Sequence, residues 1–377
     1  MADFPATIWL VAAAVPPCLI TWLMTFAVRR WAPRWGLVDH PAARKVHTTP
    51  TPLGGGLAIA CGVLATFGLG ELALRLVEYQ PAWLEPIPEW AREHLPGLRQ
   101  KSGALWLLLG GASLLSFLGL LDDRRGLPWQ LRLLVQFVVA GVVVSVPELR
   151  LTAFIALPAV TWVLSVIWIV GLINSFNMLD NMDGLSGGIG AISAGMLAAV
   201  LLLAPDPETQ RPQLFVAGYL LVLVGALLGF LFHNRPPARI FMGDAGSYFL
   251  GFYVATATLA ATYAGYQSPR PHAIFAPLCV MAVPLYDMTT VLWIRIREGR
   301  SPFQADKCHL SHRLVDLGLT KVQAVLTIYL LTLTCGLGAL LLHRVDVVGA
   351  VLILLLIACV LTLIAILEST ARRKLKP

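Results

Sequence analysis

Two asparagines and two aspartates follow one another at intervals of three residues where an apolar run ends, at Asn174, Asn177, Asp180 and Asp183. Polar groups at the end of a membrane-spanning helix are costly to place there, so they usually belong to a functional site. An α-helix turns about 100° per residue, so this spacing drifts around the helix and cannot keep all of the side chains on one face unless the helix end unwinds. Gly184 makes unwinding plausible, because glycine tolerates the backbone angles of a loop that lies against a ligand. Helix capping alone would explain only part of the cluster, so we interpret it as a binding or catalytic site.

Further carboxylates mark the ends of other apolar runs. Asp122 and Asp123 close one run, and Asp244 stands between two glycines just before another. Together with the aspartates of the first cluster they would repel one another unless a cation lies among them. We expect Mg²⁺, or Mn²⁺ in its place, because Mg²⁺ typically uses one or two carboxylates and completes its shell with water and substrate phosphate. The turn around Asp244 also leaves backbone N–H groups for a phosphate, although an ordinary helix cap would explain Asp244 as well.

A basic segment supplies the opposite charge. The stretch Arg295–Arg313 contains four arginines, one lysine and two histidines, His309 and His312. In one interpretation it is a cytoplasmic loop that follows the positive-inside rule, and in the other its arginine and histidine donors bind a diphosphate. Carboxylates with a hard metal on one side and basic donors on the other are the parts that phosphoryl transfer requires, since that chemistry is mostly positioning and charge neutralisation.

The composition defines the class of protein. Of 377 residues, 57% are hydrophobic and 13% are charged, and the mean hydropathy is +0.75. These values are typical of a polytopic membrane protein, so we expect an all-α helical bundle that forms a single transmembrane domain over residues 1–377. The net charge of +7 indicates orientation in the membrane and contact with anionic lipid or phosphate, not binding of nucleic acid. The six cysteines show no C-x-x-C spacing, so neither a disulfide framework nor a zinc site is expected.

Eleven apolar runs are long enough, or nearly so, to cross a bilayer. They are Ile8–Val28, Leu53–Val77, Ala104–Leu121, Leu133–Val146, Pro158–Ile173, Ser186–Ala204, Leu214–Phe232, Ser247–Ala264, Ala273–Ile294, Val322–Leu342 and Val347–Leu367. A path that starts with the N-terminus outside places 20 of the 28 basic residues on the cytoplasmic side and ends with the C-terminus there, in agreement with the positive-inside rule. On this path every polar cluster described above reaches the cytoplasmic face, and so does the first loop with Lys45 and His47.

Taken together, the motifs resemble the polyprenyl-phosphate N-acetylhexosamine-1-phosphate transferases, which form glycosyltransferase family 4. The resemblance rests on Asp39-His40-Pro41, Arg44-Lys45-Val46-His47, Pro50-Thr51-Pro52-Leu53-Gly54-Gly55 and His309-Leu310-Ser311-His312-Arg313, with Asp122-Asp123, Asn174–Leu185 and Phe241–Ser247 between them in the family's order. Ser311 departs from the family's pattern, because many members carry a third histidine at that position. The family implies ten or eleven helices and an active site on the cytoplasmic face.

The resemblance also implies roles for individual residues. Asp122, with Asp123 beside it, resembles the carboxylate that orients or deprotonates the acceptor phosphate, and Asp244 resembles the principal Mg²⁺ ligand. The complete expected set comprises Asp122, Asp123, Asp180 and Asp244 as catalytic residues; Lys45, His47, Asn174, Asp183, Phe241, His309, His312 and Arg313 as substrate-binding residues; and Asp244 and Asn177 as metal ligands. In this set Asp183 and Phe241 would contact uracil, whereas His312 and Arg313 would bind the diphosphate.

The reaction that the resemblance implies is transfer of GlcNAc-1-phosphate from UDP-GlcNAc to undecaprenyl phosphate or another polyprenyl phosphate, with release of UMP. It would take place in the bacterial inner membrane as the first membrane step of cell-envelope glycan synthesis, and a homodimer is one assembly to consider. Transfer of phospho-MurNAc-pentapeptide or another HexNAc-1-phosphate is the alternative, although the R-K-x-H and P-T-P blocks look more like the GlcNAc branch. A transporter of phosphorylated solutes is a distant alternative, because transporters place their sites near the bilayer midplane and between internal repeats.

Overall fold

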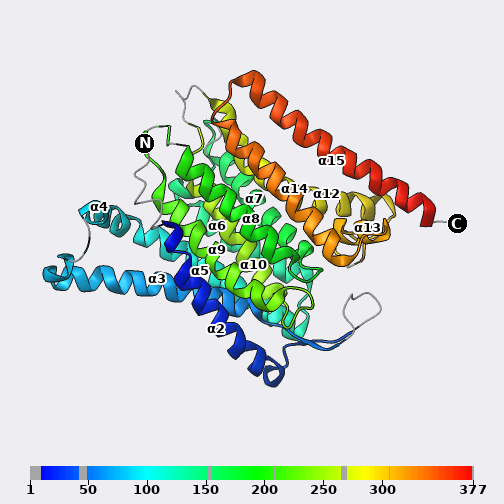
Figure 1. Cartoon of the computed structure of the whole chain (residues 1–377), viewed down its shortest axis with the longest axis horizontal. Coiled ribbons are helices and arrows are strands. Elements are labelled where there is room, and N and C mark those ends of the chain that lie inside the picture. The colour runs from blue at the N-terminus through cyan, green and yellow to red at the C-terminus, as the bar shows by residue number, and fades with distance from the viewer. Residues whose placement is uncertain are drawn as a thin grey trace.

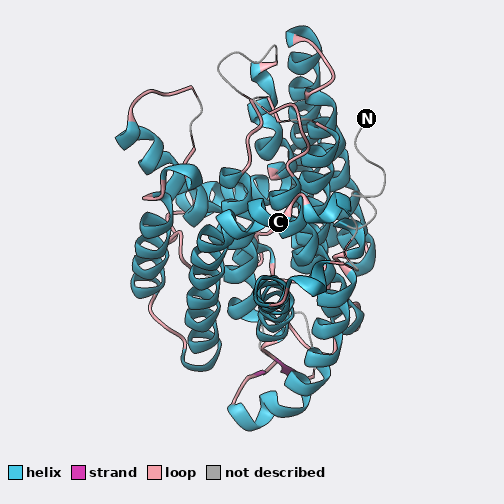
Figure 2. Ribbon diagram, turned by 90° about the vertical axis from the view of Figure 1, so that its left-hand side faces the viewer, coloured by secondary structure: helices cyan, strands magenta, loops and turns pink. Residues whose placement is uncertain are grey.

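The computed structural model of the chain describes residues 10–41, 49–85, 87, 89–151, 154–204, 206–207, 209–264, 270–304 and 306–375. Almost all of the ordered structure is helical, and one pair of short strands lies at an edge of the molecule (Figure 2). The all-α class expected from the sequence is therefore confirmed. Lys45 and His47 lie outside the described residues.

The elements follow the apolar runs of the sequence. The helices are α2 (Val15–Trp31), α3 (Gly55–Tyr79), α4 (Glu89–Arg92), α5 (Leu95–Arg125), α6 (Trp129–Val144), α7 (Pro158–Leu179), α8 (Leu185–Leu203), α9 (Leu214–Asn234), α10 (Gly243–Ala260), α11 (Ala276–Val280), α12 (Ala282–Arg297), α13 (Leu310–Asp316), α14 (Lys321–Leu342) and α15 (Val347–Leu375). Strands β1 (Val38–Asp39) and β2 (Thr51–Pro52) pair in antiparallel register. A helix satisfies every backbone hydrogen bond within the segment, which is what an apolar stretch needs in lipid.

Helix α10 forms the centre of the bundle. All of its residues except Asp244 and Ala260 are buried, and it packs against α3, α5, α7, α8 and α9. In Figure 1 the helices α5 to α10 form the middle of the molecule, α2 and α3 flank it on one side, and α12, α14 and α15 lie on the other. A helix that is apolar on all sides is typically buried on all sides. The acid in the first turn of α10, Asp244, departs from this pattern, which indicates a functional role.

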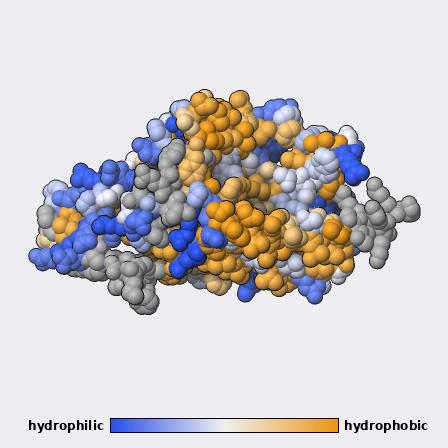
Figure 3. All heavy atoms as spheres, turned by 90° about the horizontal axis from the view of Figure 1, so that it is seen from above, coloured by the Kyte–Doolittle hydropathy of each residue, from blue (hydrophilic) through white to orange (hydrophobic). Residues whose placement is uncertain are grey.

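The outer helices present apolar faces. Leu352 and Leu356 of α15 are 61% and 57% exposed, and Figure 3 shows apolar side chains gathered over broad parts of the surface. Such faces are stable against lipid and not against water. The protein is therefore a multi-pass membrane protein, as its composition predicted.

Each of the eleven predicted runs overlaps a helix in the described part of the chain. Within the residues that the structure describes, eight helices are long and apolar enough to cross a membrane, and a ninth candidate is the pair Pro271–Val280 and Ala282–Arg297, which is bent by 64°. Pro284 lies in the first turn of α12, next to this bend, where a proline removes a backbone donor and favours a break. Helix α6 is shorter, with 16 residues. The count of eleven spans and the orientation of the termini remain predictions.

The crossing of α3 and α10 depends on glycine. A Cβ atom on Gly56 would lie 2.0 Å from the backbone nitrogen of Gly246, so the two helices approach as closely as only small residues permit. We expect Gly56→Ala to destabilise the protein by about 1–3 kcal/mol through overpacking, seen as a lower melting temperature in detergent. Gly68, in the same helix, has no atom within 4 Å of the corresponding position, so Gly68→Ala is the matched control. Equal melting temperatures for the two variants would contradict the close crossing.

Candidate active site

The N-terminus of α10 is the point where the predicted acids meet. Gly243 has a φ of +72°, which glycine adopts without strain, and this turn directs the next residue, Asp244, toward α5 and α7. Asp123 of α5 lies directly against the turn: its Oδ1 accepts a hydrogen bond from the backbone N–H of Asp244 at 2.9 Å, and its Oδ2 accepts one from Ala245 at 3.2 Å. Asp123 therefore caps α10 from a neighbouring helix. The expectation that these N–H groups are available to a phosphate is wrong, because the Asp123 carboxylate already occupies them.

Asp122 is held by partners that the sequence did not single out. It is only 7% exposed, and its Oδ2 lies 2.6 Å from Arg132 Nη1 and accepts a hydrogen bond from the Tyr248 hydroxyl at 3.2 Å. Its Oδ1 accepts a hydrogen bond from the backbone N–H of Leu127 at 2.7 Å. Arg132 Nη1 also lies 3.7 Å from Asp244 Oδ2. The guanidinium thus bridges the two aspartates and fixes where the Asp122 carboxylate points.

Asn177 belongs to the same site, whereas Asn174 does not. Helix α7 remains helical through Leu179, so the two asparagines diverge around it as their spacing predicted. The Asn177 amide donates to Asp244 Oδ1 at 2.6 Å and to the Ser247 hydroxyl at 3.0 Å. The Asn174 amide instead donates to Gln136 Oε1 of α6 at 2.7 Å and to the Val170 carbonyl at 2.8 Å. Asn174 therefore joins α6 to α7 beside the site.

The turn after α7 carries the remaining aspartates of the first cluster. Burial, together with the nearby charge of Asp123, raises the pKa of Asp180 to about 7, which is the response expected when carboxylates crowd together without enough positive charge. Asp183 Oδ2 accepts a hydrogen bond from the backbone N–H of Ala238 at 2.9 Å. This bond ties the turn to the loop that leads from α9 into α10.

Phe241 connects the site to the Pro50–Gly55 block of the sequence. Its backbone N–H donates to the Pro52 carbonyl, and its carbonyl accepts from Gly55, both at 2.9 Å. The Pro50–Gly55 block thus lies along the segment that leads into α10, although 186 residues separate Gly55 from Phe241. Of the two predicted uracil contacts, Asp183 therefore bonds to one end of the segment 238–241 from the turn after α7, and Phe241 lies at the other end of that segment.

The donors at this site fit a divalent cation. In the described ranges no three His, Cys, Asp or Glu side chains converge as a ready metal cage, but Mg²⁺ typically needs only one or two carboxylates. Asn177 Nδ2 contacts Asp244 Oδ1. Turning the Asn177 amide over would point its oxygen toward Asp244 in place of its nitrogen, so that both residues could offer an oxygen to one cation. Arg132 offsets part of the negative charge of Asp122 and Asp244. The acids that remain favour a further cation at this point.

The basic segment runs from the end of α12 to the middle of α13, and most of its basic side chains lie against carboxylates. Arg295 Nε and Arg300 Nη1 lie 3.1 Å and 2.6 Å from Asp306 Oδ2, so the expectation that both arginines are available to a diphosphate is wrong. His309, 6% exposed, places its Nδ1 at 2.9 Å from Oδ2 of Asp287, a fully buried acid of α12. The pairing of acid and base removes most of the free positive charge that the sequence alone implied.

His312 is the most accessible of the predicted diphosphate ligands in this segment, being half-buried where His309 and Arg313 are buried. Burial and the neighbouring His309 and Lys307 lower the pKa of His312 to about 4, so its imidazole is neutral at pH 7. Ser311, the residue that departs from the family's pattern, donates from its hydroxyl to Asn181 Oδ1 at 2.5 Å. This bond places α13 against the turn that carries Asp180 and Asp183.

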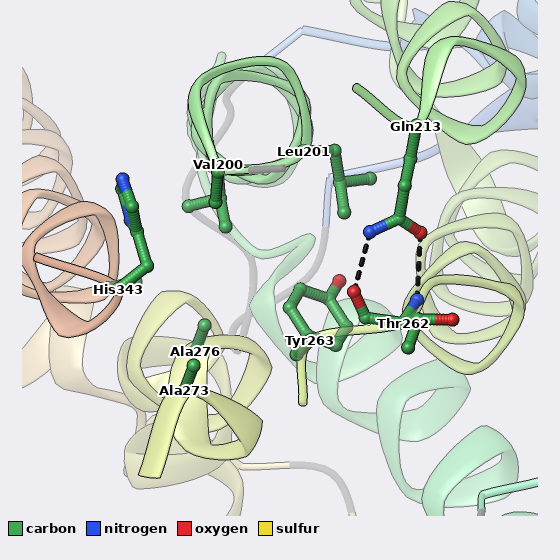
Figure 4. Close-up of a pocket in the computed structure, with 10 residues that line it drawn as sticks. Val200, Leu201, Gln213, Thr262, Tyr263, Ala273, Ala276 and His343 are labelled. Atoms are coloured by element: carbon green, nitrogen blue, oxygen red, sulfur yellow. Dashed lines mark hydrogen bonds between the residues drawn. The ribbon is translucent and has the colours of Figure 1, made fainter. Parts of the chain in front are cut away.

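A small cavity lies at the opposite end of the helices from the acidic site and has a different character. It is a space of about 10 Å³, room for about one water molecule, where α8, α10 and α14 end. Its polar feature is Gln213, whose amide donates to the Thr262 carbonyl at 2.5 Å and accepts from the Thr262 N–H at 2.8 Å (Figure 4). Gln213 and Thr262 satisfy each other, whereas the Tyr263 hydroxyl and His343 Nδ1, which also line the cavity, have no hydrogen-bond partner among the described residues. The space has room for a water molecule beside these atoms but is too small for a substrate.

The fold and the site define a polytopic membrane protein with an acidic centre at one end of its helices. The family model described as "Glycosyl transferase family 4" matches residues 105–262. This range contains α6 to α10 and all five of the predicted acids, Asp122, Asp123, Asp180, Asp183 and Asp244. The chain belongs to this family and is therefore a transferase. The resemblance drawn from the motifs is confirmed.

Relatives of known name match over nearly the whole chain. The chain is 31% identical to a probable undecaprenyl-phosphate N-acetylglucosaminyl 1-phosphate transferase of Bacillus subtilis (strain 168), over 98% of this chain and 94% of that protein. It is 31% identical to a decaprenyl-phosphate N-acetylglucosaminephosphotransferase of Mycobacterium tuberculosis (strain ATCC 25618 / H37Rv), over 95% and 89%. It is 29% identical to an undecaprenyl-phosphate alpha-N-acetylglucosaminyl 1-phosphate transferase of Escherichia coli (strain K12), over 83% and 78%.

Proposed function

We propose that this protein transfers GlcNAc-1-phosphate from UDP-GlcNAc to a polyprenyl phosphate in the bacterial inner membrane, giving polyprenyl-diphospho-GlcNAc and UMP. The observation that carries the proposal is the meeting of Asp122, Asp123, Asn177 and Asp244 at the first turn of α10. Every relative named above has a polyprenyl phosphate and an N-acetylglucosamine phosphate in its name. Membership of a transferase family favours this enzyme over the transporter.

The proposed metal ligands are Asp244 and Asn177, which would hold Mg²⁺ or Mn²⁺. Such an ion supplies charge neutralisation at the diphosphate of the donor. Asp123 keeps Asp244 in place by accepting the N–H groups of Asp244 and Ala245. Its proposed role is therefore to position the ligand.

Asp122 is the proposed carboxylate for the acceptor. Arg132 and Tyr248 fix both its direction and its ionised form, because both donate to the same oxygen. We propose that Asp122 orients the acceptor phosphate or removes its remaining proton. An oxygen of that phosphate then bonds to the β-phosphorus of UDP-GlcNAc, the bond from this phosphorus to the bridging oxygen breaks, and UMP leaves with the bridging oxygen.

A covalent enzyme intermediate is not required for this reaction. Covalent catalysis helps when the attacking group is weak, but a phosphate monoester already carries a charged oxygen nucleophile. Direct transfer instead depends on holding both substrates in line. The loops around Asp183 and Phe241, which are tied together through residues 238–241, are the proposed contacts for uracil, and Lys45 and His47 are proposed contacts from the first loop.

His312 is the proposed contact to the donor diphosphate from α13. We expect His312→Ala to raise the KM for UDP-GlcNAc by roughly 10- to 150-fold, since a hydrogen bond to a charged group contributes about 1.5–3 kcal/mol. The KM for the polyprenyl phosphate should not change. Asp316→Asn, an exposed substitution in the same short helix, is the control. An unchanged KM for the donor in His312→Ala would mean that the basic segment Arg295–Arg313 is explained by the positive-inside rule alone.

The identity of the sugar is tested by offering donors side by side. Protein purified in detergent would receive a polyprenyl phosphate, Mg²⁺ and either UDP-GlcNAc, UDP-GalNAc or UDP-MurNAc-pentapeptide, and UMP would be measured. We expect the highest kcat/KM with UDP-GlcNAc. A preference for UDP-MurNAc-pentapeptide would move the protein to the other branch of the family without changing the proposed chemistry.

A further inference from the structure

The terminal helix α15 buries one acid near its end. Glu368 is 5% exposed, although most of the residues before it in α15 face outward. Its Oε2 lies 3.1 Å from Arg313 Nε and accepts a hydrogen bond from the Tyr286 hydroxyl at 3.1 Å. A carboxylate withdrawn from water is costly unless it is paired, so its presence in an otherwise apolar helix calls for a role.

The same contacts continue through Arg313 into α12. Arg313 Nη2 donates to the Thr290 hydroxyl at 3.0 Å and lies 3.8 Å from Asp287 Oδ1. Asp287 in turn accepts a hydrogen bond from the backbone N–H of Leu310 at 2.5 Å and pairs with His309. The four charged or ionisable side chains Glu368, Arg313, Asp287 and His309, which we call the α12–α13–α15 network, therefore join three helices.

Helix α13 depends on such contacts because it is short. It has seven residues, and an isolated helix of that length is not stable in water. Asp287 holds its first N–H group, and Arg313 fixes its middle to Thr290 and Glu368. On its other side Ser311 bonds to Asn181 beside the acidic turn. Figure 1 shows α13 next to the C-terminal part of α15, in agreement with the contacts between the two helices.

We propose that Glu368 is a positioning residue for donor binding: through Arg313 it fixes α13, so that His312 faces the acidic site. Arg313 acts within the same network, because its guanidinium is 95% buried against Glu368, Thr290 and Asp287. The inference rests on the proposed function of α13. It gives the last helix of the chain a part in the reaction, beyond anchoring the protein in the membrane.

The test compares Glu368→Ala and Glu368→Gln with the unmodified protein in two measurements. Hydrogen exchange of the backbone amides of residues 310–316 reports the order of α13 without any substrate. Steady-state kinetics report the KM for UDP-GlcNAc and for the polyprenyl phosphate separately. We expect Glu368→Ala to speed the exchange and to raise the donor KM by roughly tenfold or more, as for a buried pair that loses one partner, while the acceptor KM stays unchanged.

Two further variants serve as controls for the loss of the Glu368–Arg313 pair. Tyr286→Phe removes the hydroxyl but keeps the Glu368–Arg313 pair, and it should remain close to the unmodified protein. Thr362→Ala changes an exposed residue of α15 and is the matched control in the same helix. Glu368→Gln retains the shape and an acceptor for Tyr286 and loses only the charge, so it remains informative if the alanine variant does not fold.

The proposal is overturned if folded Glu368→Ala or Glu368→Gln shows a lower melting temperature with normal exchange in α13 and a normal donor KM. Glu368 would then only anchor α15 to the bundle. A failure of the proposed function is distinguishable, because it would appear as an absence of UMP with the unmodified protein. In that case the exchange of residues 310–316 would still report whether Glu368 orders α13.

Discussion

Asp244→Ala is expected to reduce kcat by roughly 10³-fold or more, because charge neutralisation by a bound metal contributes several kcal/mol to phosphoryl transfer. Mg²⁺ typically uses only one or two protein carboxylates, so the proposed site would not retain the ion after losing Asp244. The neighbouring acids are already engaged, since Asp122 pairs with Arg132 and Tyr248 and Asp123 accepts the N–H groups of Asp244 and Ala245, so neither is free to replace the lost ligand. The measurement is UMP release at several Mg²⁺ concentrations, with raised Mg²⁺ failing to restore the rate.

A second measurement separates metal binding from activity. Mn²⁺ bound to the purified protein can be counted by electron paramagnetic resonance, and we expect the bound ion to be lost in Asp244→Ala. Asp346→Asn, which changes an exposed carboxylate before α15, is the control and should retain it. Normal turnover and normal Mn²⁺ binding in Asp244→Ala would remove this residue from the metal site.

Asp122→Asn is expected to produce the second large effect, a fall in kcat of roughly 10²- to 10⁴-fold, the range for losing a positioned acid or base. Asparagine preserves the shape of the side chain, and so the hydrogen bond from the Leu127 N–H, but it removes the charge that pairs with Arg132. The donor KM should change little, because Asp122 is assigned to the acceptor. Tyr248→Phe, which keeps the carboxylate and removes one of its donors, should show a smaller effect.

The same residue distinguishes the two possible reaction paths. Enzyme, Mg²⁺ and UDP-GlcNAc are incubated after all polyprenyl phosphate has been stripped away, and UMP is quantified against enzyme. Direct transfer predicts no UMP and no exchange of labelled UMP into UDP-GlcNAc. A burst of UMP equal to the enzyme, lost in Asp122→Asn, would instead make this aspartate a covalent nucleophile.

The sequence predicted the helical class and the acidic centre because both depend on residue type and order along the chain. An apolar run predicts a helix wherever it folds, and acids that interrupt such runs at one end predict a shared site. That Asn174 and Asn177 point in different directions around α7 followed from helix geometry alone. The family resemblance placed Asn177 and Asp244 in one metal site, and the two residues are in contact. The partner of Asn174, Gln136, was not predicted, because the sequence of a helix does not show how its neighbours are rotated against it.

The residues missed by sequence reasoning are single polar groups whose partners come from distant segments. Arg132 counted only toward membrane orientation, and nothing near Asp287 or Glu368 in the sequence indicates that they bind His309 and Arg313. For Asp287 and Glu368 the sequence did carry one signal, because an acid inside an apolar helix is rarely without a partner. The free N–H groups expected at α10 were assigned wrongly for the same reason, because Asp123 is 121 residues away from Asp244 in the chain.

The most direct test of the central claim is the identity of the lipid product. Purified protein in detergent, with Mg²⁺, UDP-GlcNAc and a polyprenyl phosphate, should convert the lipid to a species heavier by one GlcNAc-1-phosphate, detected by mass spectrometry, with one UMP released for each lipid converted. Both products should disappear when either substrate is omitted. An unmodified lipid and no UMP from well-folded protein, or UDP in place of UMP, would contradict the proposed transfer of a sugar phosphate.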